Sequence, residues 1–236
     1  MSNRIRDDVR QSGFAIVPAT EMRDHLSGLS MRDFSAFADS WNALDFDEYM
    51  ADGGRYRRRR HAVFHLKGDA FERLPHQPHY QSRDYNSLNG GIERWFTAVK
   101  PETAANPSLN AVIAACRDVF ALDPSTDYFV EMHQFRIEAS PGQVGQPTPE
   151  GMHRDGVDRV CVMLVDRVNL EQGVTSIARP DGEPLGAFTL VAPMDAVFID
   201  DHRVVHGVTA VTPADPTQPG HRDVLVLTFK GLSPAF

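Results

Sequence analysis

His153 and Asp155 are the residues of this sequence whose types and spacing best suit metal chemistry. They stand two positions apart, so on an extended chain their side chains point to the same side. Gly156 follows directly and permits a turn that lets the end of a strand present both side chains to one ion. A third ligand must then come from elsewhere in the chain.

His206 is the best candidate for that ligand, because it lies in the apolar segment 204–208, where an isolated histidine needs a partner. Two imidazoles and one carboxylate on one face of an ion leave the other positions open, as suits a non-haem Fe(II) oxygenase. The tripeptide HxD also arises often by chance, and a lone buried histidine is more often a hydrogen-bonded core residue than a ligand. These residues therefore predict a metal site beside a purely structural alternative.

Arg222 adds a second kind of chemistry downstream. The sequence His221-Arg222-Asp223 opens the apolar segment 224–229, after His206 in the chain. A guanidinium there can bind a dicarboxylate co-substrate through two parallel N–H groups. The ordered set of HxD, distal histidine and arginine is a stronger indication than HxD alone.

The run of four arginines at 57–60 has three interpretations. In a strand its side chains alternate between two faces, so only half of them can line one surface. We expect Arg57, Arg59 and His61 to share the face toward the site and to bind a substrate carboxylate. Pairing with surface acids is an equally good alternative, and a nucleic-acid patch is a weaker one because the chain is acidic.

Helices are expected to precede a β-rich half. The sequence predicts a strand at 13–18, a helix from Thr20 to about residue 40 and a strand at 55–66. A loop, alone or with one short strand, is expected at 75–91, and a helix from Asn106-Pro107 to about 123. Short β-type runs follow at 128–137, 160–165, 174–177, 188–191, 196–199, 204–208 and 224–229. This order predicts an α+β chain whose second half is a sandwich or barrel. We expect one domain over 1–236, with a helical and strand part at 1–125 and a metal-binding β core at 126–236.

Composition narrows the class of protein. The 32 acidic and 24 basic residues give a net charge of −8, which argues against a general binder of nucleic acid or anionic membranes. No apolar run has the length of a membrane-spanning helix and the start of the sequence lacks a secretory signal, so a cytoplasmic protein is expected. Cys116 and Cys161 are expected to be buried thiols rather than a disulfide pair. The oligomeric state is open, with a dimer as one possibility.

Five stretches of the sequence carry a family resemblance. They are 55–60 (RYRRRR), 133–137 (HQFRI), 149–156 (PEGMHRDG), 198–203 (FIDDHR) with His206, and 220–223 (GHRD). In these stretches the chain resembles the bacterial 2-oxoglutarate and Fe(II)-dependent dioxygenases that include free L-amino-acid hydroxylases such as isoleucine dioxygenase, and also the biofilm stress and motility protein homologues. The resemblance extends over most of the chain from residue 13.

The resemblance implies a double-stranded β-helix, or jelly roll, with the metal at one mouth of the barrel. Carried over by position, His153, Asp155 and His206 would be the catalytic iron ligands and Arg222 would hold the distal carboxylate of 2-oxoglutarate. Gln134 would help to hold the other end of that co-substrate. The stretch between His206 and Arg222 contains three prolines and is long for such enzymes, which keeps His221 and Lys230 open as alternative cationic partners.

The resemblance further implies the reaction. Fe(II), 2-oxoglutarate and O₂ would be used to hydroxylate a small molecule, expected to be a free L-amino acid, with release of succinate and CO₂. Two other functions remain open: a jelly-roll metalloenzyme that does not use 2-oxoglutarate, and a non-catalytic stress-response or ligand-sensing module. No nucleic-acid or membrane partner is expected.

Overall fold

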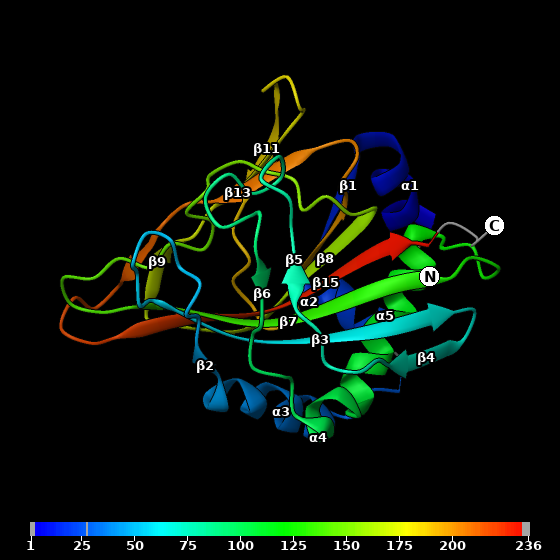
Figure 1. Cartoon of the computed structure of the whole chain (residues 1–236), viewed down its shortest axis with the longest axis horizontal. Helices are drawn as coiled ribbons and strands as arrows, with labels where there is room; N and C mark the ends of the chain where they lie inside the picture. Colours follow the sequence, from blue (N-terminus) through cyan, green and yellow to red (C-terminus); the bar gives the residue numbers. More distant parts are fainter. Residues whose placement is uncertain (1–2, 27, 233–236) are drawn as a thin grey trace.

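The computed structural model describes residues 3–26 and 28–232, in which short helices accompany a large antiparallel sheet (Figure 1). The helices are α1 (Asn3–Ser12), α2 (Ala19–His25), α3 (Met31–Asp39), the 3₁₀ turn η1 (Ser40–Ala43), α4 (Pro101–Ala104) and α5 (Pro107–Phe120). The first strands are β1 (Phe14–Val17), β2 (Asp45–Phe46), β3 (Arg57–Lys67), β4 (Ala70–Arg73), β5 (His79–Tyr80) and β6 (Glu93–Arg94). The later strands are β7 (Tyr128–Ala139), β8 (Arg159–Val168), β9 (Leu170–Gln172), β10 (Thr175–Ala178), β11 (Pro184–Phe188), β12 (Ala196–Asp200), β13 (Val205–Val208), β14 (Val211–Pro213) and β15 (Gly220–Gly231).

Two sheets face each other in the fold, and both halves of the chain contribute strands to the larger one. The larger runs in the order β1-β12-β8-β15-β7-β3-β2, with β4 added to β3, and the smaller in the order β11-β10-β13. The smaller sheet stands on one side of the larger one, while α2, α3 and α5 lie on its other side (Figure 1). This is the arrangement of the expected jelly roll, with space between the sheets for a site.

Alternation along the long strands separates a core face from a site face. On β15, Leu225, Leu227 and Phe229 pack into the hydrophobic core beneath the helices. The alternating residues Val224 and Val226, which point to the other face of β15, line a cavity between the sheets. Each long strand therefore anchors the fold with one set of side chains and builds the site with the other.

The N-terminal helices differ from the prediction. Helix α1 was not expected, because Ile5 and Val9 are its only buried apolar residues and its other positions are polar or small. The helix predicted from Thr20 to about 40 is two helices. Gly28, at φ +86°, lies in the break, and the Ser30 side chain accepts the Asp33 N–H to start α3.

The remaining elements largely follow the predicted pattern. Helix α5 begins at the Asn106 cap, whose side chain accepts the Ser108 N–H. Strand β3 buries Phe64 and Leu66 in the core on one face, as alternation predicted. The strand predicted at 188–191 is wrong: β11 ends at Phe188, where the predicted strand was to begin.

Other sequence-based expectations concern burial and the surface. Cys116 and Cys161 are both fully buried free thiols, as predicted. Within the described residues, no helix has the length and apolar character needed to cross a membrane.

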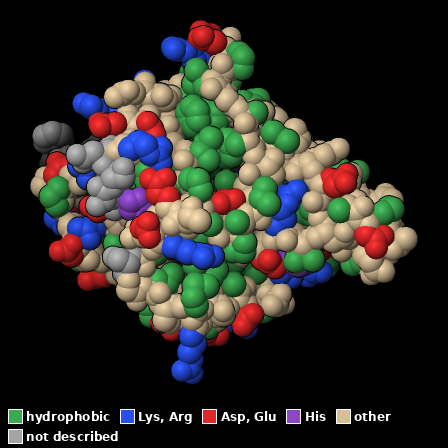
Figure 2. Space-filling view, turned by 180° about the vertical axis from the view of Figure 1, so that it is seen from behind, with side chains coloured by type: hydrophobic (Ala, Val, Ile, Leu, Met, Phe, Trp, Pro, Cys, Tyr) green, Lys and Arg blue, Asp and Glu red, His purple; other side chains and the backbone are tan. Residues whose placement is uncertain are grey.

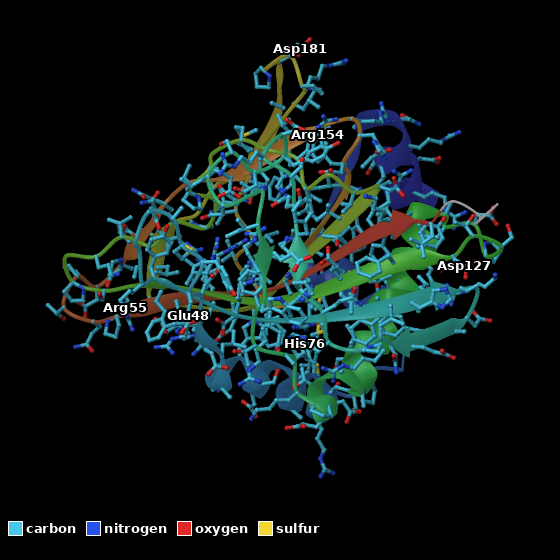
Figure 3. The ribbon with its side chains drawn as sticks, in the orientation of Figure 1. Glu48, Arg55, His76, Asp127, Arg154 and Asp181 are labelled. Carbon is cyan, nitrogen blue, oxygen red and sulfur yellow. The ribbon has the colours of Figure 1, made fainter. Side chains whose placement is uncertain are left out.

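On the face opposite to that of Figure 1, basic and acidic side chains are interspersed around a band of apolar ones (Figure 2). The hairpin of β10 and β11 projects from the body with Asp181 near its tip (Figure 3).

Candidate active site

The structure brings His153, Asp155 and His206 together at the edge of the smaller sheet. His153 and His206 exchange both backbone hydrogen bonds at 2.9 Å, and their ring centroids lie 4.6 Å apart. The Asp155 carboxylate lies 3.7 Å from Nε2 of His153 and 3.6 Å from Nε2 of His206. One potential ligand atom from each residue lies within 4.8 Å of the others, so the three side chains can converge on one ion.

The protonation of His153 suits ligation through Nε2. Its Nδ1 lies 3.0 Å from the carbonyl oxygen of Gly151, which can only accept, so Nδ1 carries the proton and Nε2 has a free lone pair in the neutral ring. Burial disfavours charge on this ring, but the Asp155 carboxylate raises the pKa of His153 to about 9 in the metal-free protein. A metal ion would replace that proton.

Of the other two candidate ligands, His206 is buried and Asp155 is half-buried. Burial, with the charge of His153, lowers the pKa of His206 to about 4, so this ring is neutral at pH 7. Burial opposes ionisation of Asp155, yet its hydrogen bond with His153 and the charges of both histidines lower its pKa to about 2. A carboxylate and a neutral imidazole are the forms that bind a metal ion.

The turn after His153 has a tight local structure. Gly156 adopts φ +81°, and a Cβ there would lie 2.5 Å from the ring of Tyr85. Arg154 stands between His153 and Asp155 in the sequence (Figure 3). Its guanidinium lies 5.5 Å from the centre of the same ring. Glycine at 156 is therefore required both by the backbone conformation and by the close approach of Tyr85.

The candidate ligands open onto a cavity of about 600 Å³ between the two sheets. Arg222 lines this cavity from β15 and is buried, and its Nε has no hydrogen-bond partner within residues 3–26 and 28–232. Burial, followed by the charge of Arg167, lowers the pKa of Arg222 to about 10, so it remains charged at pH 7. Its neighbour Asp223 is hydrogen-bonded to Arg136 instead. A buried guanidinium in this state fits a carboxylate entering the cavity.

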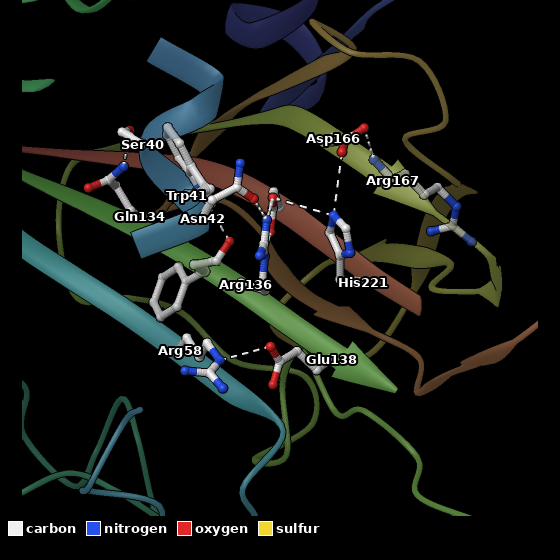
Figure 4. A network of polar contacts seen from close by, with 12 residues as sticks. Ser40, Trp41, Asn42, Arg58, Gln134, Arg136, Glu138, Asp166, Arg167 and His221 are labelled. Atoms are coloured by element: carbon white, nitrogen blue, oxygen red, sulfur yellow. Dashed lines mark hydrogen bonds and ion pairs between the residues drawn. The ribbon is translucent and has the colours of Figure 1, made fainter. Parts of the chain in front are cut away.

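Gln134 does not reach that cavity, contrary to the prediction. It lies on the core face of β7, where its Nε2 donates to Oγ of Ser40 at 2.8 Å (Figure 4). The alternation of β7 instead puts His133 and Phe135 in the cavity wall. Of the alternative cations, His221 lies near Asp166 on the same face of the large sheet as Gln134, away from the cavity, whereas Lys230 lines the cavity at an exposed position.

The arginine run divides between the two faces of β3, as its alternation predicted. Arg57 and Arg59 are buried in the cavity wall. Arg58 and Arg60 lie on the opposite face, where they pair with Glu138 and Asp45. The run thus supplies two cations to the site and two to ion pairs elsewhere.

The prediction for His61 needs correction. His61 is fully buried and is absent from the set of side chains that line the cavity. Its Nε2 lies 3.0 Å from Oε1 of Glu131, which also bonds Nδ1 of His79 at 2.7 Å. Burial opposes ionisation of Glu131, but these histidines lower the pKa of the carboxyl group. His61 therefore supports a carboxylate in the cavity wall and does not itself face the cavity.

His133 belongs to the same cluster of His61, His79 and Glu131 and lines the cavity. Arg59 lies 2.7 Å from Nδ1 of His133 and can only donate, so Nδ1 accepts and Nε2 of the neutral ring carries the proton. Although the four side chains are close enough for a metal ion, this hydrogen bond occupies the lone pair of His133 and puts a guanidinium beside the cluster. We therefore interpret the cluster as a hydrogen-bonded wall.

Three further charged or polar residues of the site were missed by sequence reasoning. Asp47 bonds Nε of Arg57 at 2.7 Å and lies 3.6 Å from Arg59. Arg94 is buried in the cavity wall, where its Nη2 donates to Gln81 at 3.4 Å. Gln81 in turn donates to the backbone carbonyl of Asp155 at 3.0 Å. Asp47 follows β2, Gln81 follows β5 and Arg94 belongs to β6, so only the folded chain brings them together.

A family model described as 2OG-Fe dioxygenase matches residues 38–228. A crystal structure of a BsmA homologue from Methylobium petroleophilum is 35% identical in sequence, with a TM-score of 0.88 over 99% of this chain and 95% of that one. The likeness confirms the predicted jelly roll.

Two curated relatives carry names of activities. L-isoleucine-4-hydroxylase of Bacillus thuringiensis is 25% identical over 157 residues, which is 64% of this chain and 64% of that protein. The match thus spans less than two thirds of that relative's length. 3(1)-hydroxy-L-isoleucine 4-dioxygenase of Pantoea ananatis is 20% identical over 234 residues, 93% of this chain and 92% of that protein.

Proposed function

This chain belongs to the 2OG-Fe dioxygenase family, and we propose that it hydroxylates a free L-amino acid with release of succinate and CO₂. Membership makes it an enzyme that uses Fe(II), 2-oxoglutarate and O₂. That cofactor set disfavours the two other functions considered above, a metalloenzyme without 2-oxoglutarate and a non-catalytic module. The amino-acid substrate is the part that goes beyond the family.

His153, Asp155 and His206 are the proposed iron ligands, and Arg222 is the proposed partner of the distal carboxylate of 2-oxoglutarate. The observation that carries this assignment is that the three converging ligand atoms share one cavity with the buried guanidinium of Arg222, whose Nε has no hydrogen-bond partner among the described residues. When bound, the iron and 2-oxoglutarate supply the oxidising chemistry. The chain supplies ligand geometry and apolar walls that exclude water, including Val160, Val162 and Val226.

The amino-acid assignment draws support from a second group of buried charges in the wall of the same cavity. Arg57 and Arg59 are proposed to hold the substrate carboxylate, with Arg94 beside them. Nη2 of Arg57, Nε of Arg59 and Nε of Arg94 are buried and lack hydrogen-bond partners among the described residues. Asp47 partners only the first two arginines, so the group can accept an additional anion. The names of the two curated relatives agree with an amino acid.

Two measurements test the proposal. Anaerobic addition of Fe(II) and 2-oxoglutarate to the protein is expected to give a visible metal-to-ligand charge-transfer band, and its absence at saturating ligand would refute the assigned co-substrate site. A panel of free L-amino acids is then assayed for substrate-dependent succinate release. Release with at least one of them is expected, and silence across the panel with the band intact would reject the amino-acid substrate alone.

We also propose that residues 1–236 form one domain. Strand β3 from the N-terminal part pairs along ten residues with β7 of the β core, which supports one continuous unit. The cytoplasmic location, the dimer and the lack of nucleic-acid or membrane partners stay predictions.

A further inference from the structure

Glu150 is a buried carboxylate that the assignments above do not use. It lies three residues before His153, lines the cavity, and has a side chain only 9% exposed. Its Oε1 lies 3.7 Å from Nε2 of His153. Its Oε2 is buried and has no hydrogen-bond partner among the residues that the structure describes. A carboxylate in this state calls for a cationic partner, since burying a charge without one is costly.

Metal binding changes the contact between Glu150 and His153. Nδ1 of His153 carries its proton toward the Gly151 carbonyl, so Nε2 is the atom left for the ion. A ligated Nε2 has no proton to share with Glu150. The carboxylate then lies beside the metal ligands in the wall of the cavity, where a bound molecule can approach it.

Glu131 is the other carboxylate of the cavity wall to which no bound group is assigned, and it differs from Glu150 in its hydrogen bonding. His61 and His79 both contact its Oε1, at 3.0 and 2.7 Å. This carboxylate therefore already has two hydrogen-bond partners within the wall. Of the two carboxylates, Glu150 has the greater need of a partner from the bound molecule.

The cavity thus presents opposite charges from different elements. Arg59 and Arg94 supply buried cations whose Nε groups have no hydrogen-bond partner among the described residues, and Glu150 supplies the carboxylate. Gln81 connects Arg94 to the backbone of Asp155 through two hydrogen bonds, which fixes the arginine relative to the turn that carries the candidate ligands. A small molecule with one carboxylate and one ammonium group matches this distribution of charge.

We propose that Glu150 binds the α-ammonium group of the substrate while the arginines bind its carboxylate. This inference rests on the amino-acid hydroxylase function proposed above and assigns the group that recognises the amine. Because Glu150 lies next to His153, it holds the amine end close to the metal ligands. Glu150 is thereby a specificity-determining residue that favours amino acids over carboxylic acids without an amine.

The variant Glu150→Gln keeps the shape of the side chain and removes its charge. The L-amino acid with the greatest succinate release in the panel is compared with the same acid lacking its amino group, using kcat/KM for each. The amino acid is expected to lose at least about 30-fold in kcat/KM in the variant, mostly through KM, because the ammonium is left without its buried counter-charge. The analogue without the amine is expected to change much less, so the preference for the amine collapses.

Binding gives a second readout that does not depend on turnover. Anaerobic titration of the same amino acid into protein loaded with Fe(II) and 2-oxoglutarate perturbs the charge-transfer band and yields a Kd. E150Q is expected to raise that Kd by a similar factor. Glu138→Gln is the matched control, since Glu138 pairs with Arg58 on the outer face, away from the cavity.

The outcomes are separable. Retained preference for the amine in E150Q overturns the proposal, as does a preference that is lost in E131Q but kept in E150Q. An intact charge-transfer band with no response to any amino acid also overturns it, together with the amino-acid substrate. Absence of the band in the wild type would instead reject the co-substrate site.

Discussion

The side chain of Asp201 accepts a hydrogen bond from the backbone N–H of Asp155 at 3.0 Å. The same carboxylate accepts the N–H groups of Gly156 and Val157, at 2.8 and 3.2 Å. Burial, and then the negative charge of Asp155, raise the pKa of Asp201 to about 6. Asp201 thus holds the turn that positions a candidate metal ligand through its backbone.

The variant Asp201→Asn is expected to weaken Fe(II) binding by about 10–100-fold, the usual effect of removing a group that orients a metal ligand. The carboxylate accepts hydrogen bonds from three backbone N–H groups, and the amide of the variant would turn its own N–H group toward one of them. Anaerobic titration with Fe(II), followed by 2-oxoglutarate to develop the charge-transfer band, measures the affinity. Asp200→Asn is the control, because Asp200 pairs with Arg159 outside this turn. Equal affinity in D201N and wild type would contradict the role.

Removal of the Asp155 carboxylate is expected to abolish substrate-dependent succinate formation, with a loss of more than about 100-fold. Asp155 is the one anionic ligand in the proposed set, so its loss leaves the ion with two neutral histidines. Succinate release and iron content of the purified Asp155→Ala variant are measured together, with the far-UV circular dichroism spectrum as a check of folding. Turnover at the wild-type rate would rule out the proposed ligand set.

Arg222→Met is expected to raise the 2-oxoglutarate Kd by on the order of 100-fold, since the buried counter-charge of the distal carboxylate is lost. The charge-transfer titration gives this Kd directly. Gln134→Leu serves as the comparison, because Gln134 bonds Ser40 on the other face of β7 and its replacement should leave the Kd unchanged. The reverse pattern would restore Gln134 to the co-substrate site and remove Arg222 from it.

Acid is expected to destabilise the metal-free protein through His133. Burial, and then the charge of Arg59, hold the pKa of His133 well below its usual range. The unfolded chain takes up this proton near pH 6.5 while the folded chain does not, so the unfolding free energy falls as the pH is lowered below about 6.5. The limiting slope is about 1.4 kcal/mol per pH unit for one histidine.

Urea unfolding of wild type and His133→Asn at several values between pH 7 and pH 5 checks this. The asparagine oxygen can still accept from Arg59 but does not titrate in this range. The wild type should lose more stability than the variant over the interval, and parallel pH profiles would contradict the buried neutral state of His133.

The sequence was informative where periodicity and chemistry coincide. Alternation along the arginine run correctly separated Arg57 and Arg59 from Arg58 and Arg60, because a strand has only two faces. The HxD pair and His206 could be selected as candidates because few residue types can bind a metal, and the structure brings the three side chains together. Helix α1 gave no comparable signal, since its polar sequence holds only two buried apolar side chains.

Residues whose roles depend on distant segments could not be found in this way. Asp47, Arg94 and Glu131 become informative only once β2, β6 and β7 are adjacent to β3 or to the loops around it. Gln134 was assigned to the wrong face because adjacent residues His133 and Gln134 are both polar, and alternation fixes that they differ in direction without fixing which one faces inward. Long-range packing decides that question.

The position of β3 has an evolutionary consequence. Proposed ligands His153, Asp155 and His206 belong to the turn before β8 and to β13, whereas Arg57 and Arg59 belong to β3, which joins the large sheet through backbone hydrogen bonds to β7. Because those bonds do not depend on side-chain identity, side chains on β3 can be exchanged while the ligand geometry is kept. Descendants of one ancestral oxygenase could therefore acquire new substrates by changing a peripheral strand, without rebuilding the centre that activates oxygen.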